Sequence, residues 1–229
     1  MTTSGADEQW TGEVKDTPDE HCIVKRTEVF TGHVWSVVTD RVDFDGHEVS
    51  RDIQLHPGAV AVIALDDQER VLLIRQYRHP VGMRLFEPPA GLLDKPGEPV
   101  WQTAARELAE EAGFAASSWN VLVDLFTTPG GSSEAIRIYL ARGLTPLAGG
   151  RLHTNEAEEA HLPRVFVPLE EARDLVLSGA IGCTSTVSGI LAAWAAREAG
   201  WQHLRPVDAP WAARDALLAA DRVRHLHRP

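Results

Sequence analysis

The hydrophobic pattern of the chain changes period several times, and each change marks a predicted element. Between residues 22 and 57, three runs are strand-like and alternate in part, at 23–30, 33–42 and 48–55. Asp45-Gly46 separates the second and third runs and is a strong hairpin signal. Such a small sheet is marginal alone, so we expect its apolar side chains to pack on another surface.

The following segment is richer in buried strands. Residues 59–65 form a continuous apolar run, typical of a strand that is buried on both faces. Residues 66–69 provide a turn, and 71–78 is its predicted partner strand. Further strands are predicted at 119–126, 135–141 and 165–167, and helices at 169–178, 185–199 and 211–224.

A helix with one apolar face is predicted between these strands, at residues 99–112. Pro99 suits a first helical position and Gly113 the position just past the end. At 100° per residue the apolar face contains Val100, Trp101, Ala104, Ala105, Leu108 and Ala112. Strands that flank this helix, with more helices after the last strand, predict an α/β sandwich.

Composition places the chain among soluble globular proteins. Its 229 residues can bury a substantial core, and 44% hydrophobic with 24% charged residues is ordinary for this class. The net charge of −11 argues against a nucleic-acid partner. The first 20 residues lack a basic start and an apolar run, and no stretch is long enough for a membrane span, which predicts a cytoplasmic protein. Cys22 and Cys183 are expected to be reduced thiols, with a single disulfide left open.

Three glutamates form a stripe at the edge of the helical apolar face. Glu107 and Glu111 are four residues apart, where like charges cost about 0.2–0.5 kcal/mol. Together with Glu110 they lie near the helix C-terminus, whose partial negative charge disfavours anions. A divalent cation reverses both penalties, because hard oxygen ligands on consecutive turns can converge on Mg²⁺. A solvated acidic patch is the alternative.

The wider pattern around these glutamates resembles the Nudix box. Gly91, Glu98 and the run REL-A-EEAGF at 106–114 match its signature, which is specific over two dozen residues. Six residues separate Gly91 from Glu98, where the usual pattern has five. The extra residue lies in the loop before the helix, so the spacing of the carboxylates is unchanged. The resemblance implies a Nudix α/β/α sandwich with a mixed sheet, here extended by an N-terminal antiparallel β-subdomain.

Stretches outside the box are similar to the ADP-ribose pyrophosphatase branch of this family, notably LIRQYR at 73–78 and EPPAGL at 87–92. The resemblance implies metal-dependent hydrolysis of ADP-ribose to AMP and ribose 5-phosphate, with Mg²⁺ or possibly Mn²⁺. The implied metal ligands are the carbonyl of Ala90 and the side chains of Glu107, Glu111 and, as a further candidate, Glu110. Arg106 would orient the box through Glu98.

Substrate contacts and the general base are implied less specifically. Arg78, Arg51 and Glu134 are the candidate substrate contacts, although a solvated strand edge or a plain loop would also explain them. The base is expected in the acidic loop at 155–162, at Glu158 or Glu159, with Glu156 third. A carboxylate there can take the proton of the attacking water. The sequence does not distinguish which phosphorus is attacked.

The resemblance also implies a homodimer that is built through the N-terminal strands and acts on a small-molecule nucleoside diphosphate sugar. We expect a tail at 1–20, the β-subdomain at 21–57, the hydrolase domain at 58–205 and a C-terminal tail at 206–229. Two alternatives stay open: hydrolysis of another nucleoside diphosphate sugar, such as GDP-mannose or UDP-glucose, and a non-catalytic binding protein of the same fold. An intact box argues against the second.

Overall fold

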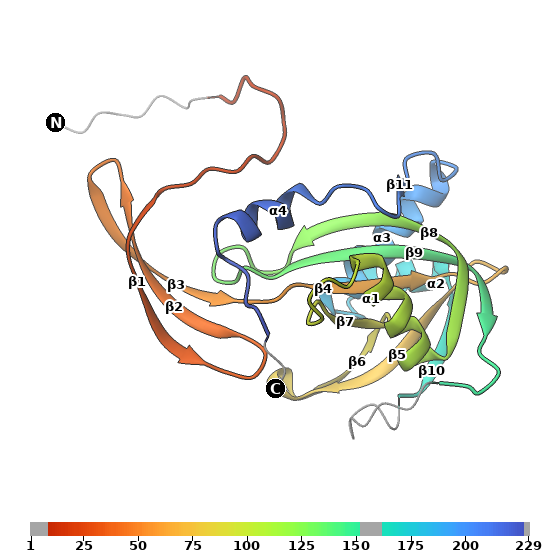
Figure 1. Ribbon diagram of the computed structural model, residues 1–229. Coiled ribbons are helices and arrows are strands. Elements are labelled where there is room, and N and C mark those ends of the chain that lie inside the picture. Colours follow the sequence, from red (N-terminus) through yellow and green to blue (C-terminus); the bar gives the residue numbers. More distant parts are fainter. Residues whose placement is uncertain (1–8, 152–161, 227–229) are drawn as a thin grey trace.

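The computed structural model describes residues 9–151 and 162–226, and it contains a layered α/β body with a small sheet beside it (Figure 1). The larger sheet of the body is mixed, with strand order β11-β8-β9-β4-β7. Its strands are β4 (Ala59–Ala64), β7 (Ala90–Leu92), β8 (Phe114–Phe126), β9 (Ala135–Pro146) and β11 (Arg205–Pro206). The second sheet is antiparallel, with order β10-β5-β6, and contains β5 (Arg70–Arg78), β6 (Met83–Glu87) and β10 (Arg164–Pro168).

Strand β4 lies at the centre of two hydrophobic clusters. One set of alternate residues, which includes Ala61 and Ile63, packs toward α2 (Leu169–Leu177) and α3 (Thr184–Glu198). The other set, which includes Val60 and Val62, packs toward α1 (Val100–Glu107). Helices therefore cover both faces of the mixed sheet, which confirms the predicted sandwich and the strand buried on both sides.

The predicted pairing of β4 with β5 is wrong. Strand β4 pairs in parallel with β9 and in antiparallel with β7, so both of its edges are occupied. Near their turn, the two strands are joined by a bridge between Leu65 and Val71 and by a bond of 3.1 Å from the Asp66 N–H to the Arg70 carbonyl. Beyond that bridge β5 turns into the second sheet, where β10 and β6 flank it.

The carboxylate-bearing helix departs from the sequence prediction at both ends. Pro99 is its N-cap, with ψ of 136°, and the first helical residue is Val100. After Glu107 the chain continues into a π-helical turn, η2 (Leu108–Ala112), so the predicted spacing of 100° per residue does not hold in this last turn. Gly113 ends the turn in the left-handed conformation, at φ 73°, as its position predicted. Such wide turns are rare and frequent at functional sites.

The N-terminal sheet has the simple order β1-β2-β3, with β1 (Cys22–Thr31), β2 (Ser36–Phe44) and β3 (His47–Leu55). The predicted hairpin at Asp45-Gly46 is confirmed, since both residues have positive φ, 52° and 88°. The second strand begins at Ser36 rather than at the predicted residue 33, because the chain bends there and the Gly32 N–H bonds the Trp35 carbonyl. Side chains of β2 alternate, and Val38 and Val42 are buried.

The C-terminal segment packs between the small sheet and the body (Figure 1). Helix α4 (Ala212–Ala219) is shorter than the predicted 211–224, because Asp221 adopts a left-handed φ of 52°. Beyond it, Val223 forms a parallel bridge with His56. Before α4, the buried guanidinium of Arg137 donates to the carbonyl of Ala209 at 2.7 Å.

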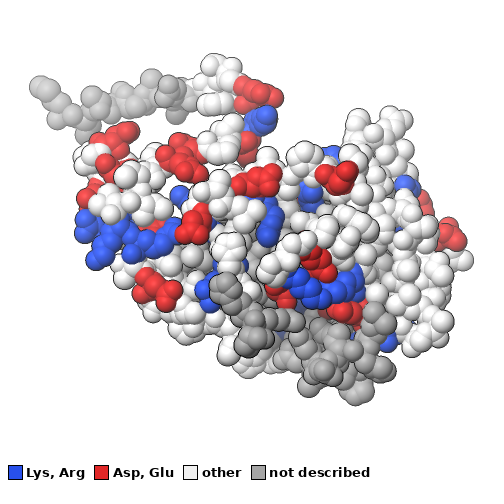
Figure 2. Space-filling view, in the orientation of Figure 1, with Lys and Arg blue, Asp and Glu red and all other residues white. Residues whose placement is uncertain are grey.

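No helix in the part of the chain that the structure describes is long and apolar enough to cross a membrane. Cys22 and Cys183 are both free thiols, as expected. On the face that Figure 2 shows, acidic and basic side chains are interspersed rather than gathered in one basic stripe. This distribution agrees with the acidic net charge of the chain.

Candidate active site

The site is built where β7 meets the C-terminal end of α1. Ala90 lies opposite Ala61 of β4, and the preceding carbonyl, of Pro89, accepts the Val62 N–H at 2.9 Å. Because hydrogen-bonded and non-bonded positions alternate in an antiparallel pair, Ala90 turns its backbone N–H and carbonyl away from β4. Its N–H donates to the carboxylate of Glu111 at 2.8 Å. The Ala90 carbonyl therefore points to the side of the strand on which Glu111 lies.

At Gly91, the absence of a side chain allows the carboxylate of Glu107 to pack directly against the same strand. A Cβ atom at this position would overlap the side chain of Glu107, so only glycine allows the close approach. Glu107 is 7% exposed and Glu111 3%, although both carry ionisable groups. Two buried carboxylates and a backbone carbonyl are thus gathered along three residues of β7.

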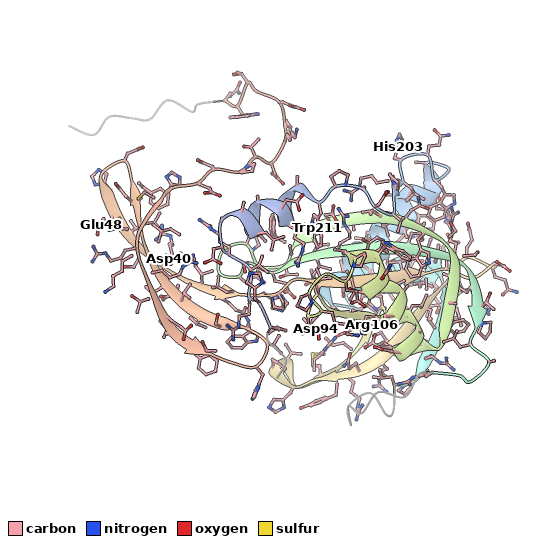
Figure 3. The ribbon with its side chains drawn as sticks, viewed as in Figure 1. Asp40, Glu48, Asp94, Arg106, His203 and Trp211 are labelled. Atoms are coloured by element: carbon pink, nitrogen blue, oxygen red, sulfur yellow. The ribbon has the colours of Figure 1, made fainter. Side chains whose placement is uncertain are left out.

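Arg106 is the cation around which the box carboxylates are arranged. Its guanidinium lies 2.7 Å from Glu107, 2.8 Å from Glu110 and 3.4 Å from Glu98. Asp94 lies 4.0 Å away, and Figure 3 shows it beside Arg106. The predicted repulsion between glutamates is therefore relieved in part by this arginine, which the sequence-based argument for a cation did not take into account.

These contacts shift the pKa values of both partners in the direction of the charged forms. Burial alone would lower the pKa of Arg106, but the carboxylates, Glu107 first, raise it well above its ordinary value. Burial alone would raise the pKa of Glu98. Hydrogen bonds from Thr103, at 2.8 Å, and from Arg106 outweigh that effect and lower it. Arg106 and Glu98 are consequently both charged at neutral pH.

The donor set has the chemistry of a hard divalent cation site. Among residues 9–151 and 162–226, no three acidic, histidine or cysteine side chains gather closely enough to form a metal cluster by themselves. The carboxylates of Glu107 and Glu111 and the carbonyl of Ala90 nevertheless meet along β7, and all are oxygen ligands of the kind that Mg²⁺ takes. Glu110 faces Arg106 instead, through a bond of 2.8 Å.

Arg78 lies at the edge of this group, and its partner is a residue to which the sequence analysis gave no role. Glu87 is 3% exposed and accepts two bonds from Arg78 Nε, at 3.0 Å each, and one from Nη2 at 2.5 Å. Burial would lower the pKa of Arg78, but Glu87 and, more weakly, Glu111 raise it. The Arg78 guanidinium is therefore charged and within electrostatic range of the box.

A signal for this pair was present in the sequence. Arg78, Gln76 and Ile74 share one face of β5, because side chains alternate along a strand, and Ile74 lies opposite Glu87 in the register with β6. An isolated buried carboxylate is too costly, so a glutamate in an apolar hairpin requires a cation on its own face. Parity within the hairpin would have selected Arg78.

The other two candidate substrate contacts lie apart from the glutamates. Arg51 is exposed on β3, where its guanidinium lies 5.9 Å from the Phe44 ring centre and bonds the Ser50 carbonyl. It lines a hollow of about 450 Å³ against the loop at 129–133. Glu134 accepts a bond of 2.5 Å from Thr127 and lies 3.5 Å from His56.

The candidate bases Glu158 and Glu159, and also Glu156, lie outside the described residues. Their predicted role therefore stays a prediction. Arg164, which follows this segment, bonds the carbonyl of Ala112 in the π-helical turn.

The NUDIX domain family model matches residues 55–181. The chain is 44% identical over 194 residues to the ADP-ribose pyrophosphatase of Mycobacterium tuberculosis, covering 84% of this chain and 92% of that protein. It is 35% identical over 161 residues to the ADP-ribose pyrophosphatase of Bacillus subtilis, covering 69% and 84%. A crystal structure of an ADP compounds hydrolase matches with a TM-score of 0.67 and 26% identity, covering 81% and 98%.

Proposed function

The chain belongs to the Nudix family, and from that premise we propose that it hydrolyses the pyrophosphate bond of ADP-ribose to AMP and ribose 5-phosphate. It is a Nudix pyrophosphohydrolase. The observation that carries the choice of substrate is 44% identity, over 84% of the chain, to a protein named ADP-ribose pyrophosphatase. The box residues of this site are all present, and their charges are arranged around Arg106.

The reaction needs a divalent cation, which we propose to be Mg²⁺ or Mn²⁺. A pyrophosphate repels nucleophiles by its own negative charge, and a bound divalent cation neutralises that charge and acidifies water. Glu107, Glu111 and the carbonyl of Ala90 would hold it, with Glu110 as a further candidate ligand. Arg106 holds Glu107 in place, because its guanidinium lies 2.7 Å from that carboxylate.

The remaining roles concern substrate and proton. Arg78, held by Glu87, would bind a phosphate oxygen or the terminal ribose. Arg51 and Glu134 are the further proposed substrate contacts. A glutamate of the segment 155–162, Glu158 or Glu159, would remove the proton of the attacking water.

We further propose that the enzyme is a cytoplasmic homodimer and that residues 21–57 are the dimerisation unit, beside a hydrolase domain at 58–205. The support is the separate three-stranded sheet, which leaves large apolar side chains exposed. The predicted tails at 1–20 and 206–229 complete this division, although α4 and the strand-like segment after it pack on the body.

A substrate panel tests the proposal directly. ADP-ribose, GDP-mannose and UDP-glucose are incubated with Mg²⁺ or Mn²⁺, and the released nucleotide is identified by chromatography. We expect AMP from ADP-ribose to form fastest and its formation to stop in excess EDTA. Faster release of GMP or UMP would show that GDP-mannose or UDP-glucose, and not ADP-ribose, is the preferred substrate. If no compound is hydrolysed, the result would favour a non-catalytic binding protein.

A further inference from the structure

A second cavity lies between the loop that precedes α1 and the C-terminal segment. Its volume is about 410 Å³, and the loop residues 93–98 form one wall while 223–226 and α4 form the other. Figure 1 shows the C-terminal segment descending on the side of the molecule where α1 lies. The extra residue of the box loop is thus in the wall of this cavity.

The cavity wall is cationic in a chain of net charge −11. Lys95, Arg214 and Arg224 line it, and so does His225. Its two acidic residues, Asp94 and Glu98, both lie near Arg106, at 4.0 Å and 3.4 Å. The positive groups of the tail therefore face a cavity whose carboxylates are directed to another cation.

Within residues 9–151 and 162–226, no carboxylate forms an ion pair with Arg224 or Arg214. Arg224 Nε is buried and has no hydrogen-bond partner among the described residues. Arg214 donates to the carbonyl of Pro57 at 2.8 Å, and a Cβ atom on Gly58 would overlap its guanidinium. Burial lowers the pKa of Arg214, and only the charge of Asp215 acts in the opposite direction. A half-buried guanidinium without an ion pair carries a desolvation cost, and an anionic ligand would offset that cost.

The wall is held in place by bonds to the rest of the protein. The backbone N–H of Arg224 donates to the backbone carbonyl of His56 at 3.2 Å, and Val223 forms a β-bridge with His56. On the other side of α4, Arg137 lies over the ring of Trp211 at 4.8 Å. The arginines therefore project from an anchored segment.

We propose that this cavity is a binding site for a small phosphate monoester, separate from the glutamate site. A phosphate dianion suits two guanidinium groups and a lysine, which can donate several charge-assisted bonds to its oxygens. The volume exceeds that of a bare ion and suits a ligand with an organic group. The cavity borders Val100 at the start of α1, whereas Glu107 ends this helix seven residues later, roughly 10 Å away at 1.5 Å per residue. Arg106, which contacts both Glu98 of the wall and Glu107, lies between the two sites.

Titration calorimetry on the full chain tests the site independently of catalysis. The buffer contains EDTA, and the probes are AMP, ribose 5-phosphate and inorganic phosphate, with adenosine as the uncharged control. We expect one monoester per chain to bind, more tightly than inorganic phosphate, and adenosine not to bind. Arg224→Gln should raise the Kd of the monoester by about tenfold or more, because a hydrogen bond to a charged group is lost.

Three variants make the result specific. Arg142→Gln removes the same charge from a residue stacked on Trp201, so it should leave binding unchanged. Arg78→Gln alters the glutamate site and should also leave binding unchanged. Lys95→Gln changes an exposed loop position and provides a second test if Arg224→Gln unfolds. Loss of binding in Arg78→Gln but not in Arg224→Gln, equal affinity for inorganic phosphate, or no binding at all would overturn the proposal.

Discussion

At the scale of single residues, the site depends on which group each carboxylate faces. The spacing of Glu107, Glu110 and Glu111 singled out this helix for the proposed site, because it is a local pattern. It did not show that Glu107 and Glu110 form ion pairs with Arg106, or that Glu111 accepts a hydrogen bond from a backbone N–H. These contacts depend on the directions of the side chains and on the position of β7. The buried partner of Arg78 was missed although the alternation of side chains in the β5–β6 hairpin indicated it.

Glu111→Gln should reduce kcat severely while the fold persists. Outer-shell changes at metal sites commonly cost about 10–100-fold, and a proposed ligand should cost at least as much. The amide oxygen can still accept the Ala90 N–H, and the repulsion with Glu107 is removed, so the melting temperature without metal should not fall. Steady-state kinetics with ADP-ribose and a thermal melt measure both effects. Unchanged kcat, or a large loss of melting temperature, would contradict the role.

His56 should make stability depend on pH. Burial lowers its pKa from the ordinary 6.5, and the charge of Glu134 at 3.5 Å offsets only part of that effect. Below pH 6.5 the unfolded chain therefore binds a proton that the folded chain does not, and the free energy of unfolding falls by up to about 1.4 kcal/mol per pH unit. Above pH 6.5 this contribution is fully present.

The comparison is a urea titration at pH 7.5 and pH 5.5 on the natural chain and on His56→Asn. Asparagine retains an acceptor for the Gly58 N–H, which bonds Nδ1 of His56 at 3.1 Å. The natural chain should lose more stability on acidification than the variant does. Equal losses in the two proteins would show that other groups carry the pH dependence.

At the scale of elements, most strands and helices were predicted near their positions and the β2–β3 hairpin was predicted correctly, whereas the neighbours of β4 were not. The continuous apolar run of β4 predicted that both of its faces are buried, because this property can be read from the residues of the strand itself. Its neighbours β9 and β7 come from distant parts of the sequence, and the hydrophobic pattern carries no information on register with them. The π-helical turn was not predicted either, because its apolar and acidic residues are equally compatible with an ordinary α-helix.

Gly91→Ala should disable the site through the packing of β7 against α1. The added methyl group would overlap the Glu107 carboxylate, so this side chain must leave β7 or the helix must shift. We expect kcat to fall by at least about tenfold, because a small displacement of a catalytic group is costly. The matched control is Gly149→Ala, where the new methyl group meets nothing within 4 Å and should leave kcat unchanged. Equal kinetics in both variants would refute the packing argument.

At the scale of the whole molecule, the C-terminal segment joins parts that the sequence analysis treated separately. Arg26 of β1 donates to the Asp221 carbonyl at 2.9 Å, and Arg137 of β9 holds the chain before α4. Val223 then pairs with His56, at the junction of the small sheet and the body. These contacts join residues that are between 72 and 195 positions apart in the sequence, so no local pattern could predict them.

The N-terminal sheet leads to the prediction of a homodimer. Val29 is 61% exposed, Phe30 52% and Trp35 38%, and Phe30 lies 5.9 Å from Trp35 between ring centres. Strand β1 is also an edge of its sheet, and an edge strand with apolar side chains favours pairing with another chain. A two-fold contact through this surface would bury these side chains in both copies at once.

Light scattering at micromolar concentration should therefore give twice the 25.1 kDa of one chain. Phe30→Asp should shift the mass toward a single chain, because a charge would be buried at the contact. Leu177→Asp is the matched control, since Leu177 is 69% exposed on α2, away from this sheet, and should leave the dimer intact. A mass near that of one chain for the unmodified protein would refute the dimer. Dissociation by Leu177→Asp alone would move the contact to α2.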